Sequence, residues 1–294
     1  MMLRIAVTGK EGQVARSLAA LGPTMGAEIV LIGRPELDLA DPATVMSALA
    51  GARPDVIVSA AAYTAVDKAE TEKDLAFAIN GAGAGAVAAA AGNMNIPIVH
   101  LSTDYVFDGT KAGRYLETDP TRPTSVYGAS KLEGERLVAA TTPNHAIFRT
   151  AWVYSPYGSN FVKTMLRLGE TRDTLSVVGD QNGCPTSAED IARAIIIAAK
   201  TMTSDSNSKY RGVFHLTGPG EASWADFAER IFDAATNFGR NPVSVMAITS
   251  DQYPSPVKRP ANSRLSGTKL RDIYAITLPD WRESTFSVVR TLLG

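Results

Sequence analysis

The chain has 294 residues, of which 45% are hydrophobic and 20% are charged, the composition of an ordinary globular protein. Its 29 basic and 30 acidic residues give a net charge of −1, so no bulk field favours nucleic acid or an anionic membrane as a partner. The single cysteine, Cys184, excludes an internal disulfide framework, and three scattered histidines form no ligand cluster, so we expect no metal site.

The N-terminus and the apolar runs predict a cytoplasmic protein without a membrane partner. The apolar run in MMLRIAVTGK is too short for a secretory signal, and a single cysteine fits a reducing compartment. IARAIIIAAK, which we take as the longest apolar helix, carries Arg193 and cannot span a bilayer.

The first half of the chain alternates short apolar runs with longer helical segments. We expect strands at Leu3–Thr8, Glu28–Ile32, Asp55–Ser59, Pro97–Ser102 and His145–Thr150. We expect helices at Gln13–Leu21, Pro42–Leu49, Leu75–Gly92 and Tyr127–Ala139. Runs such as DVIVSA are nearly continuous in apolar residues, which is typical of parallel strands covered on both faces. The pattern predicts an α/β fold, a Rossmann-like doubly wound parallel sheet.

The second half of the chain is less regular and predicts a smaller C-terminal α/β substrate lobe. We assign residues 1–150 to a dinucleotide-binding domain and residues 151–294 mainly to the substrate lobe. Returns to the first domain are expected within residues 172–216, at Asp190–Lys200 and Gly212–Leu216.

A glycine turn, TGKEGQVA, follows the first expected strand directly and opens the first expected helix. Bare backbone at Gly9 and Gly12 would let a pyrophosphate approach the helix N-terminus, and Ala15 is small enough for close packing of that helix on the strand. A plain turn is the alternative, but the position favours a dinucleotide site. The run GAGAGA at residues 81–86 follows no strand, and we interpret it as close packing between helices.

The second expected strand ends in LIGRPELD, where the adenosine ribose of a dinucleotide would lie. A carboxylate at this place selects NAD, whereas arginine accommodates a 2′-phosphate. Arg34 therefore favours NADPH, while Glu36 and Asp38 keep NADH possible.

Two further motifs, STDYVFDG and YGASK, carry the candidate catalytic groups. Thr103 ends the fourth expected strand, where ligands of an open parallel sheet lie, and Tyr127 and Lys131 are spaced to share one face of the next helix. A free phenol has a pKa of about 10, and a nearby ammonium is expected to lower it. We expect Thr103 to polarise a substrate carbonyl, Tyr127 to donate a proton, and Lys131 to tune Tyr127 and hold the cofactor's ribose.

These motifs, with AAAYTAVDKAE, FRTAWVY, LSVVGDQNGCPT and RPANSRL, resemble the extended short-chain dehydrogenase/reductases over nearly the whole chain. They are most similar to the family members that reduce the 4-keto group of dTDP-linked deoxysugars. The resemblance implies that Thr103, Tyr127 and Lys131 are catalytic. It also implies that the nicotinamide cofactor is bound by Gly9, Gly12, Gln13, Val14, Asp38, Leu39, Ala60, Ala61, Ala62 and Thr64, together with Tyr127 and Lys131.

The same resemblance implies that a dTDP-sugar lies between the two lobes. Thr103, Asp104, Val66, Tyr105 and Trp152 would contact it, although Trp152 could equally belong to a core. Arg259 and Arg264, assisted by Asn262, would bind its diphosphate, although KRPANSRL could equally be a basic surface loop. Asn160 and Gln181 are weaker candidates.

Two other functions are compatible with the motifs. One is a different nucleotide-sugar epimerase or reductase of this superfamily. The other is a non-catalytic NADP-binding subunit similar to the regulatory subunit of methionine adenosyltransferase, which the joint presence of Thr103, Tyr127 and Lys131 disfavours. A monomer and a homodimer are both compatible with the sequence.

Overall fold

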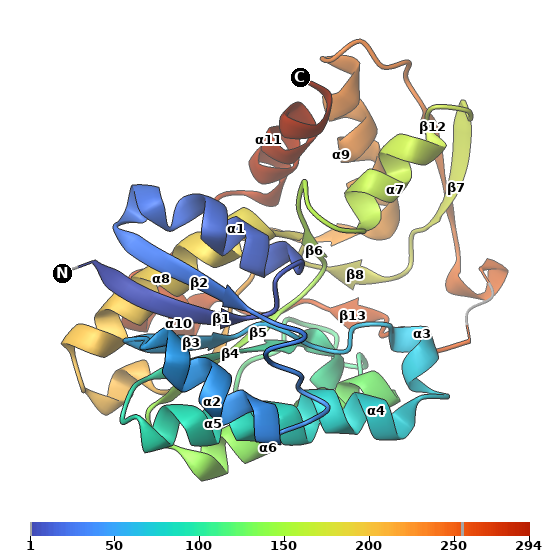
Figure 1. Ribbon diagram of the computed structural model, residues 1–294. Helices are drawn as coiled ribbons and strands as arrows, with labels where there is room; N and C mark the ends of the chain where they lie inside the picture. Colours follow the sequence, from blue (N-terminus) through green and yellow to red (C-terminus); the bar gives the residue numbers. More distant parts are fainter. Residues whose placement is uncertain (1, 254–255) are drawn as a thin grey trace.

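A central sheet of six parallel strands organises the molecule. The computed structural model describes residues 2–253 and 256–294. The strands lie in the order β10–β5–β4–β3–β1–β2 (Figure 1). They are β1 (Leu3–Thr8), β2 (Ala27–Ile32), β3 (Val56–Ser59), β4 (Ile98–Thr103), β5 (His145–Thr150) and β10 (Gly212–His215).

The sheet confirms the predicted α/β Rossmann-like class. β1 and β5 have the predicted bounds, and the other three predicted strands differ by one residue at one or both ends. The segment expected to return to the sheet is β10, which pairs with β5. The chain changes direction across the sheet between β1 and β3, and the carboxyl ends of strands beside such a switch point form a ligand crevice.

Helices cover both faces of this sheet, so the strands are apolar on both sides. One face is covered by α1 (Gln13–Leu21), α8 (Ala188–Ser204) and α10 (Thr268–Tyr274). The other face is covered by α2 (Ala43–Ala52), α5 (Ala84–Asn93) and α6 (Val126–Thr141). Three shorter segments precede α5 in the chain: α3 (Val66–Ala69), α4 (Lys73–Phe77) and η2 (Ala78–Gly83). η2 is a π-helical segment that is continuous with α4 and α5. Short 3₁₀ turns occur at η1 (Pro23–Met25), η3 (Asp104–Val106), η4 (Ser208–Tyr210) and η5 (Ser250–Gln252).

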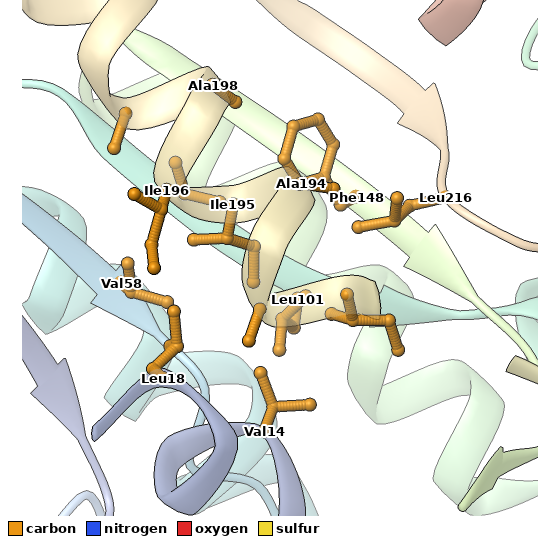
Figure 2. Close-up of a cluster of buried hydrophobic side chains, with 14 of the residues drawn as sticks. Val14, Leu18, Val58, Leu101, Phe148, Ala194, Ile195, Ile196, Ala198 and Leu216 are labelled. Carbon is orange, nitrogen blue, oxygen red and sulfur yellow. The ribbon is translucent and has the colours of Figure 1, made fainter. Parts of the chain in front are cut away.

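The larger core lies between the sheet and α1 and α8. Figure 2 shows Leu18 of α1 and Ile195 of α8 converging on Val58, Leu101 and Phe148, which come from three neighbouring strands. Successive strand residues point to opposite faces, so Ile57, Ile98 and Ile147 enter the second core with α2 and α5. Leu270 and Tyr274 of α10 also belong to the first core, a contribution that the sequence did not indicate.

A second lobe has its own apolar core, and Figure 1 shows its helices gathered beyond one end of the sheet. Its helices are α7 (Phe161–Leu168), α9 (Trp224–Thr236) and α11 (Trp281–Leu293). Its short strands are β6 (Val153–Tyr154), β7 (Thr174–Val178), β8 (Asn182–Gly183), β9 (Thr186–Ser187), β11 (Ala222–Ser223), β12 (Ser244–Ile248) and β13 (Asn262–Ser263).

The longest apolar helical segment is Lys73–Asn93, not the segment at residues 191–200 as expected, because α4, η2 and α5 join into one helix. By length and composition it could cross a membrane. Half of its most apolar stretch is nevertheless buried inside the protein, where α5 packs against the sheet, and a core helix passes the same test.

The glycines at residues 81–86 serve close packing between helices, as predicted. A Cβ on Gly81 would lie 3.3 Å from the side chain of Glu133 in α6, and a Cβ on Gly85 would lie 3.2 Å from that of Leu137, whereas Gly83 packs against the loop at Leu39. From the α6 side, a Cβ on Gly134 would overlap the carbonyl oxygen of Asn80 in η2. Absence of side chains at these positions lets α6 approach η2 and thereby fixes the height of α6 along the sheet.

Two Gly→Ala substitutions in helices should change stability in opposite directions. Gly134→Ala should lower the free energy of unfolding by at least about 1–3 kcal/mol, because its methyl group would push α6 away from η2. Gly51→Ala is the control, since a Cβ there would meet nothing within 4 Å. It should add roughly 0.5–1 kcal/mol through the greater helix propensity of alanine. Urea unfolding measures both, and equal stability of the two variants would contradict the packing described for α6.

Candidate active site

The carboxyl ends of β1, β3 and β4 lie at the same edge of the sheet, where the topology predicts a ligand crevice. The Thr8 hydroxyl, at the end of β1, accepts hydrogen bonds of 3.0 Å from the backbone N–H groups of both Ala60 and Ala61. These bonds hold the loop after β3 against the glycine turn. The side chains of Ala60, Ala61 and Ala62 are small, so they take up little space at the end of β3.

The glycine turn fits the phosphates of a dinucleotide. Gly9 has φ +96°, and a Cβ there would lie 3.3 Å from Cβ of Ala61, so both the backbone conformation and the space require glycine. Gly12 precedes α1 without a side-chain cap, and a Cβ on it would meet nothing within 4 Å. The N-terminus of α1 therefore faces open space, where its N–H groups and dipole favour an anion.

Gln13 fastens this helix terminus to the second half of the chain. Its Oε1 accepts hydrogen bonds from the hydroxyl of Ser155 at 2.8 Å and from Nδ2 of Asn160 at 3.0 Å. Asn160 also caps α7 by accepting from the backbone N–H of Lys163. In contrast, the side chains of Val14 and Leu39 are buried in the two cores, so only their backbones could reach a ligand in the crevice.

The end of β2 carries a cluster of charges. Lys10 Nζ lies 2.6 Å from the carboxylate of Glu36 and donates a 3.3 Å hydrogen bond to the carbonyl of Arg34. The hydrogen bond from Lys10 holds the pKa of Glu36 below its usual value. The side chain of Arg34 is exposed, and Asp38 is half-buried and accepts from the backbone N–H of Ala40. A hollow of about 340 Å³ adjoins this cluster and is lined by Lys10, Glu11, Arg16, Ala19, Leu31 and Tyr157.

Thr103 and Tyr127 lie together at the end of β4. The Thr103 hydroxyl caps η3 by accepting from Tyr105 N–H at 3.2 Å, and it donates to Asp104 Oδ1 at 3.0 Å. The Tyr127 ring packs edge-on against Tyr105, with 5.5 Å between ring centroids. Burial raises the pKa of Tyr127 well above its ordinary value, and hydrogen bonding with Thr103 opposes the rise.

The predicted lowering of the Tyr127 pKa by Lys131 is outweighed by burial in this arrangement. Lys131, only 3% exposed, donates a 2.6 Å hydrogen bond to the carbonyl of Leu101, and burial outweighs other influences on Tyr127. Burial also lowers the pKa of Lys131 to about 8, against the carboxylate of Glu135, which raises it. Like any phenol at neutral pH, Tyr127 is protonated, which is the form that a proton donor needs.

Buried charges beneath these residues hold α6 to the sheet. Glu135 of α6 and Arg149 of β5 form a 2.7 Å ion pair in which both side chains are 5% exposed. Ser102 donates a hydrogen bond to the same carboxylate. Nearer the crevice, burial raises the pKa of Asp104 to about 6, although hydrogen bonds from Ser263 and Thr103 lower it.

The predicted substrate contacts divide into two groups. Arg259 reaches the catalytic groups, because it donates to the Tyr105 hydroxyl at 3.2 Å and forms a 3.0 Å ion pair with Asp67, next to Val66 at the start of α3. The others take part in hydrogen bonds or packing elsewhere. Trp152, with φ +49°, stacks on Trp224 at 3.6 Å between centroids. Gln181 donates to the Ser250 hydroxyl, Asn262 donates to the carbonyls of Lys111 and Gly113, and Arg264 pairs with Glu221 and Asn262.

Sequence reasoning missed Asp67, Lys10, Glu135, Arg149 and His100 as neighbours of the candidate groups. A signal existed for Glu135, which lies four residues after Lys131 and so shares its helix face. His100 lies two residues before Ser102 and so shares its strand face. Nothing local in the sequence indicated that Asp67 and Arg259 meet.

The chain is similar to known proteins over nearly its whole length. The family described as the RmlD substrate binding domain matches residues 3–293. A protein of Sinorhizobium fredii named dTDP-4-dehydrorhamnose reductase is 54% identical over 291 residues, which are 99% of this chain and 98% of that protein. A protein of the same name from Salmonella typhimurium is 41% identical over 95% of this chain and 94% of its own length.

Solved structures give the same result. A dTDP-4-dehydrorhamnose reductase from Bacillus anthracis in complex with NADP has a TM-score of 0.91 at 34% identity, covering 99% of this chain and 100% of that one. One from Clostridium acetobutylicum has a TM-score of 0.90 at 39% identity, covering 99% of both chains. From the match over almost its whole length, the chain belongs to the RmlD substrate binding domain family.

Proposed function

We propose that the protein reduces the C4 ketone of dTDP-4-dehydro-β-L-rhamnose with NADPH and so forms dTDP-β-L-rhamnose for cell-surface polysaccharide. The observation that carries the proposal is the meeting of Thr103 and Tyr127 at the end of β4, near the buried ammonium of Lys131 and at the same edge of the sheet as the glycine turn. The relatives named as this reductase, at 41–54% identity, support the substrate. The NADP complex of the Bacillus anthracis structure supports the cofactor.

The cofactor would lie along the carboxyl ends of β1, β2 and β3. Gly9 and Gly12 would hold its pyrophosphate through backbone N–H groups, with Gln13 and the backbone of Val14 beside them. NADPH supplies the hydride that is added to the ketone carbon. The rest of its surface would meet Arg34, Asp38, Leu39, Ala60, Ala61, Ala62, Thr64, Tyr127 and Lys131.

The chain's own groups manage the proton and the charge at the ketone oxygen. Thr103, whose hydroxyl donates to Asp104 in the structure, would turn that hydrogen to the carbonyl oxygen and make the carbonyl carbon more electrophilic. Tyr127, a neutral phenol at neutral pH, gives its proton to the oxygen as negative charge develops there. Lys131 stabilises the phenolate that remains, because an ammonium nearby favours the charged form of a phenol.

We assign the dTDP-sugar to the space between the two lobes, with residues 1–150 and parts of 172–216 holding the cofactor and 151–294 mainly holding the sugar nucleotide. Arg259 is the strongest candidate for the diphosphate, since it already contacts Tyr105 and exchanges one anionic partner, Asp67, for another. Contacts of the substrate with Val66, Asp104, Tyr105, Trp152, Asn160, Gln181, Asn262 and Arg264 stay predictions.

We also propose that the enzyme works in the cytosol, where the buried free thiol of Cys184 would stay reduced. Monomeric and dimeric states both stay compatible with this function. An epimerase on the same fold would recycle its nicotinamide, whereas this reductase should oxidise one NADPH for each ketone reduced.

Tyr127→Phe should remove most turnover and leave NADPH affinity nearly unchanged. Loss of a positioned general acid costs about 10²–10⁴-fold in kcat, and the ring itself would still fill its place against Tyr105. NADPH oxidation with the purified keto-sugar nucleotide measures turnover, and fluorescence titration measures cofactor affinity. Tyr210→Phe, which removes a hydroxyl far along the chain in η4, is the control and should keep full activity. Unchanged turnover in Tyr127→Phe would rule out the assigned proton donor.

Charge substitutions at the end of β2 should change cofactor selectivity. Arg34→Gln should raise KM for NADPH about tenfold or more, because one charge-assisted bond to the 2′-phosphate is lost. KM for NADH serves as the internal control and should stay unchanged. Glu36→Gln should have the opposite effect and lower KM for NADPH, since it frees Lys10 from its ion pair. Equal changes for both cofactors would show that these residues do not read the 2′-phosphate.

A further inference from the structure

His100 is a buried histidine in the middle of β4 to which the proposed chemistry gives no role. Its side chain is 1% exposed. Nε2 lies 3.4 Å from Nζ of Lys131, and Nδ1 lies 3.1 Å from the hydroxyl of Ser59, which is opposite His100 on the neighbouring strand β3. Ser59, His100 and Lys131 therefore form a hydrogen-bonded series of polar side chains from the interior of the sheet to a point beneath Tyr127.

The register between β4 and α6 creates this contact. His100 and Ser102 are two residues apart on one face of a strand, a spacing of about 6.6 Å. Lys131 and Glu135 are four residues apart on one face of a helix, a spacing of about 6 Å. Because these side chains lie on the facing surfaces of β4 and α6, His100 meets Lys131 while Ser102 bonds Glu135.

The donors and acceptors in this hydrogen-bonded series fix the tautomer of the His100 imidazole. An ammonium only donates, so Nε2 must present its lone pair to Lys131 and the ring proton must sit on Nδ1. Nδ1 then donates to the Ser59 hydroxyl. Lys131 has three donors, and within the described part of the chain Leu101 O and His100 Nε2 take two of them. One donor is left for a ligand or for Tyr127.

We propose that His100, held by Ser59, is a positioning residue for Lys131 that accepts from its ammonium and directs its remaining donor toward Tyr127 and the cofactor ribose. The inference deepens the proposed function and rests on it for the role of Lys131. The imidazole itself touches neither substrate nor cofactor in this role.

The surrounding charges agree with a neutral imidazole beside a charged amine. Burial holds the pKa of His100 well below its usual value, and the positive charges of Lys131 and of His145 on β5 lower it further. Lys131 has a pKa of about 8, which burial lowers and Glu135 raises, so the ammonium predominates at neutral pH. An acceptor for the ammonium favours its charged form, and removal of that acceptor must lower the pKa of Lys131 further.

The first test needs no cofactor and measures the wild-type protein. The ¹⁵N shifts of the His100 ring in the wild-type protein should report a proton on Nδ1 and none on Nε2 at pH 7. His145 and His215 are the two other histidines, so assignment through single substitutions is direct. A ring protonated at Nε2, or a cationic ring, would overturn the proposal whatever the enzyme's substrate proves to be.

The second test compares His100→Phe with His100→Gln. Phenylalanine removes the acceptor, whereas the glutamine amide oxygen can replace it near the position of Nε2. The Lys131 pKa, followed by NMR of isotope-labelled lysine in the cofactor-free protein, should fall by about one pH unit in His100→Phe and stay near 8 in His100→Gln. The alkaline limb of kcat should move to lower pH in His100→Phe only, with kcat about fivefold lower at pH 8 and KM for the sugar nucleotide unchanged.

Two further variants separate positioning from folding. His215→Phe replaces another buried imidazole, on β10, and should leave the Lys131 pKa unchanged. Ser59→Ala, a smaller change that tests the case if His100→Phe does not fold, should shift the Lys131 pKa in the same direction by less. The positioning role would be overturned if the Lys131 pKa and the kcat profile were both unaffected in folded His100→Phe. It would also be overturned if both were unaffected in Ser59→Ala while the ring proton stayed on Nδ1 alone. Inactivity of the wild-type enzyme with the keto sugar would instead overturn the proposed function and leave the ¹⁵N result standing.

Discussion

The site depends on the register between β4 and α6. That register is set by close helix packing at Gly134 and by the buried ion pair between Glu135 and Arg149. Taking two charges out of water is costly, and such a pair is maintained only with good geometry and additional hydrogen bonds, such as that from Ser102. Its alignment sets the height of the whole face of α6. One turn above Glu135 stands Lys131, and one turn above that stands Tyr127, level with Thr103 at the end of β4. A slip of α6 by one residue would separate Glu135 from Arg149, Lys131 from His100 and Tyr127 from Thr103.

Burial shifts the pKa values of both groups of α6 that the chemistry uses. In water a phenol and an ammonium both lose a proton near pH 10, but the interior moves their pKa values in opposite directions because it penalises whichever form is charged. Burial therefore raises the pKa of Tyr127 and lowers that of Lys131 to about 8. The expectation that lysine would simply acidify tyrosine considered charge and left out desolvation. The proton donor described here is a neutral phenol whose ammonium neighbour matters mainly after the proton has left.

The sheet, most of its helices and the three candidate catalytic residues could be predicted because their signals are local. Strand runs such as Ile98–Thr103 are apolar on both faces, the glycine turn follows β1 directly, and Tyr127 and Lys131 are spaced by one helical turn. Contacts between distant segments could not be predicted in this way. The ion pair of Asp67 with Arg259 joins residues 192 positions apart, and only the fold brings them together. Likewise, Asn262 and Arg264 seemed to be free groups in a basic loop, whereas the structure engages them with Lys111, Gly113 and Glu221.

The most direct test of the central claim follows the hydrogen atoms. Turnover of dTDP-4-dehydro-β-L-rhamnose with NADPH deuterated at the transferred C4 position should place one deuterium at C4 of the product sugar, visible by NMR, with one NADP⁺ formed for each product. Product that carries no deuterium at C4, or conversion of the sugar nucleotide without net oxidation of NADPH, would contradict the account.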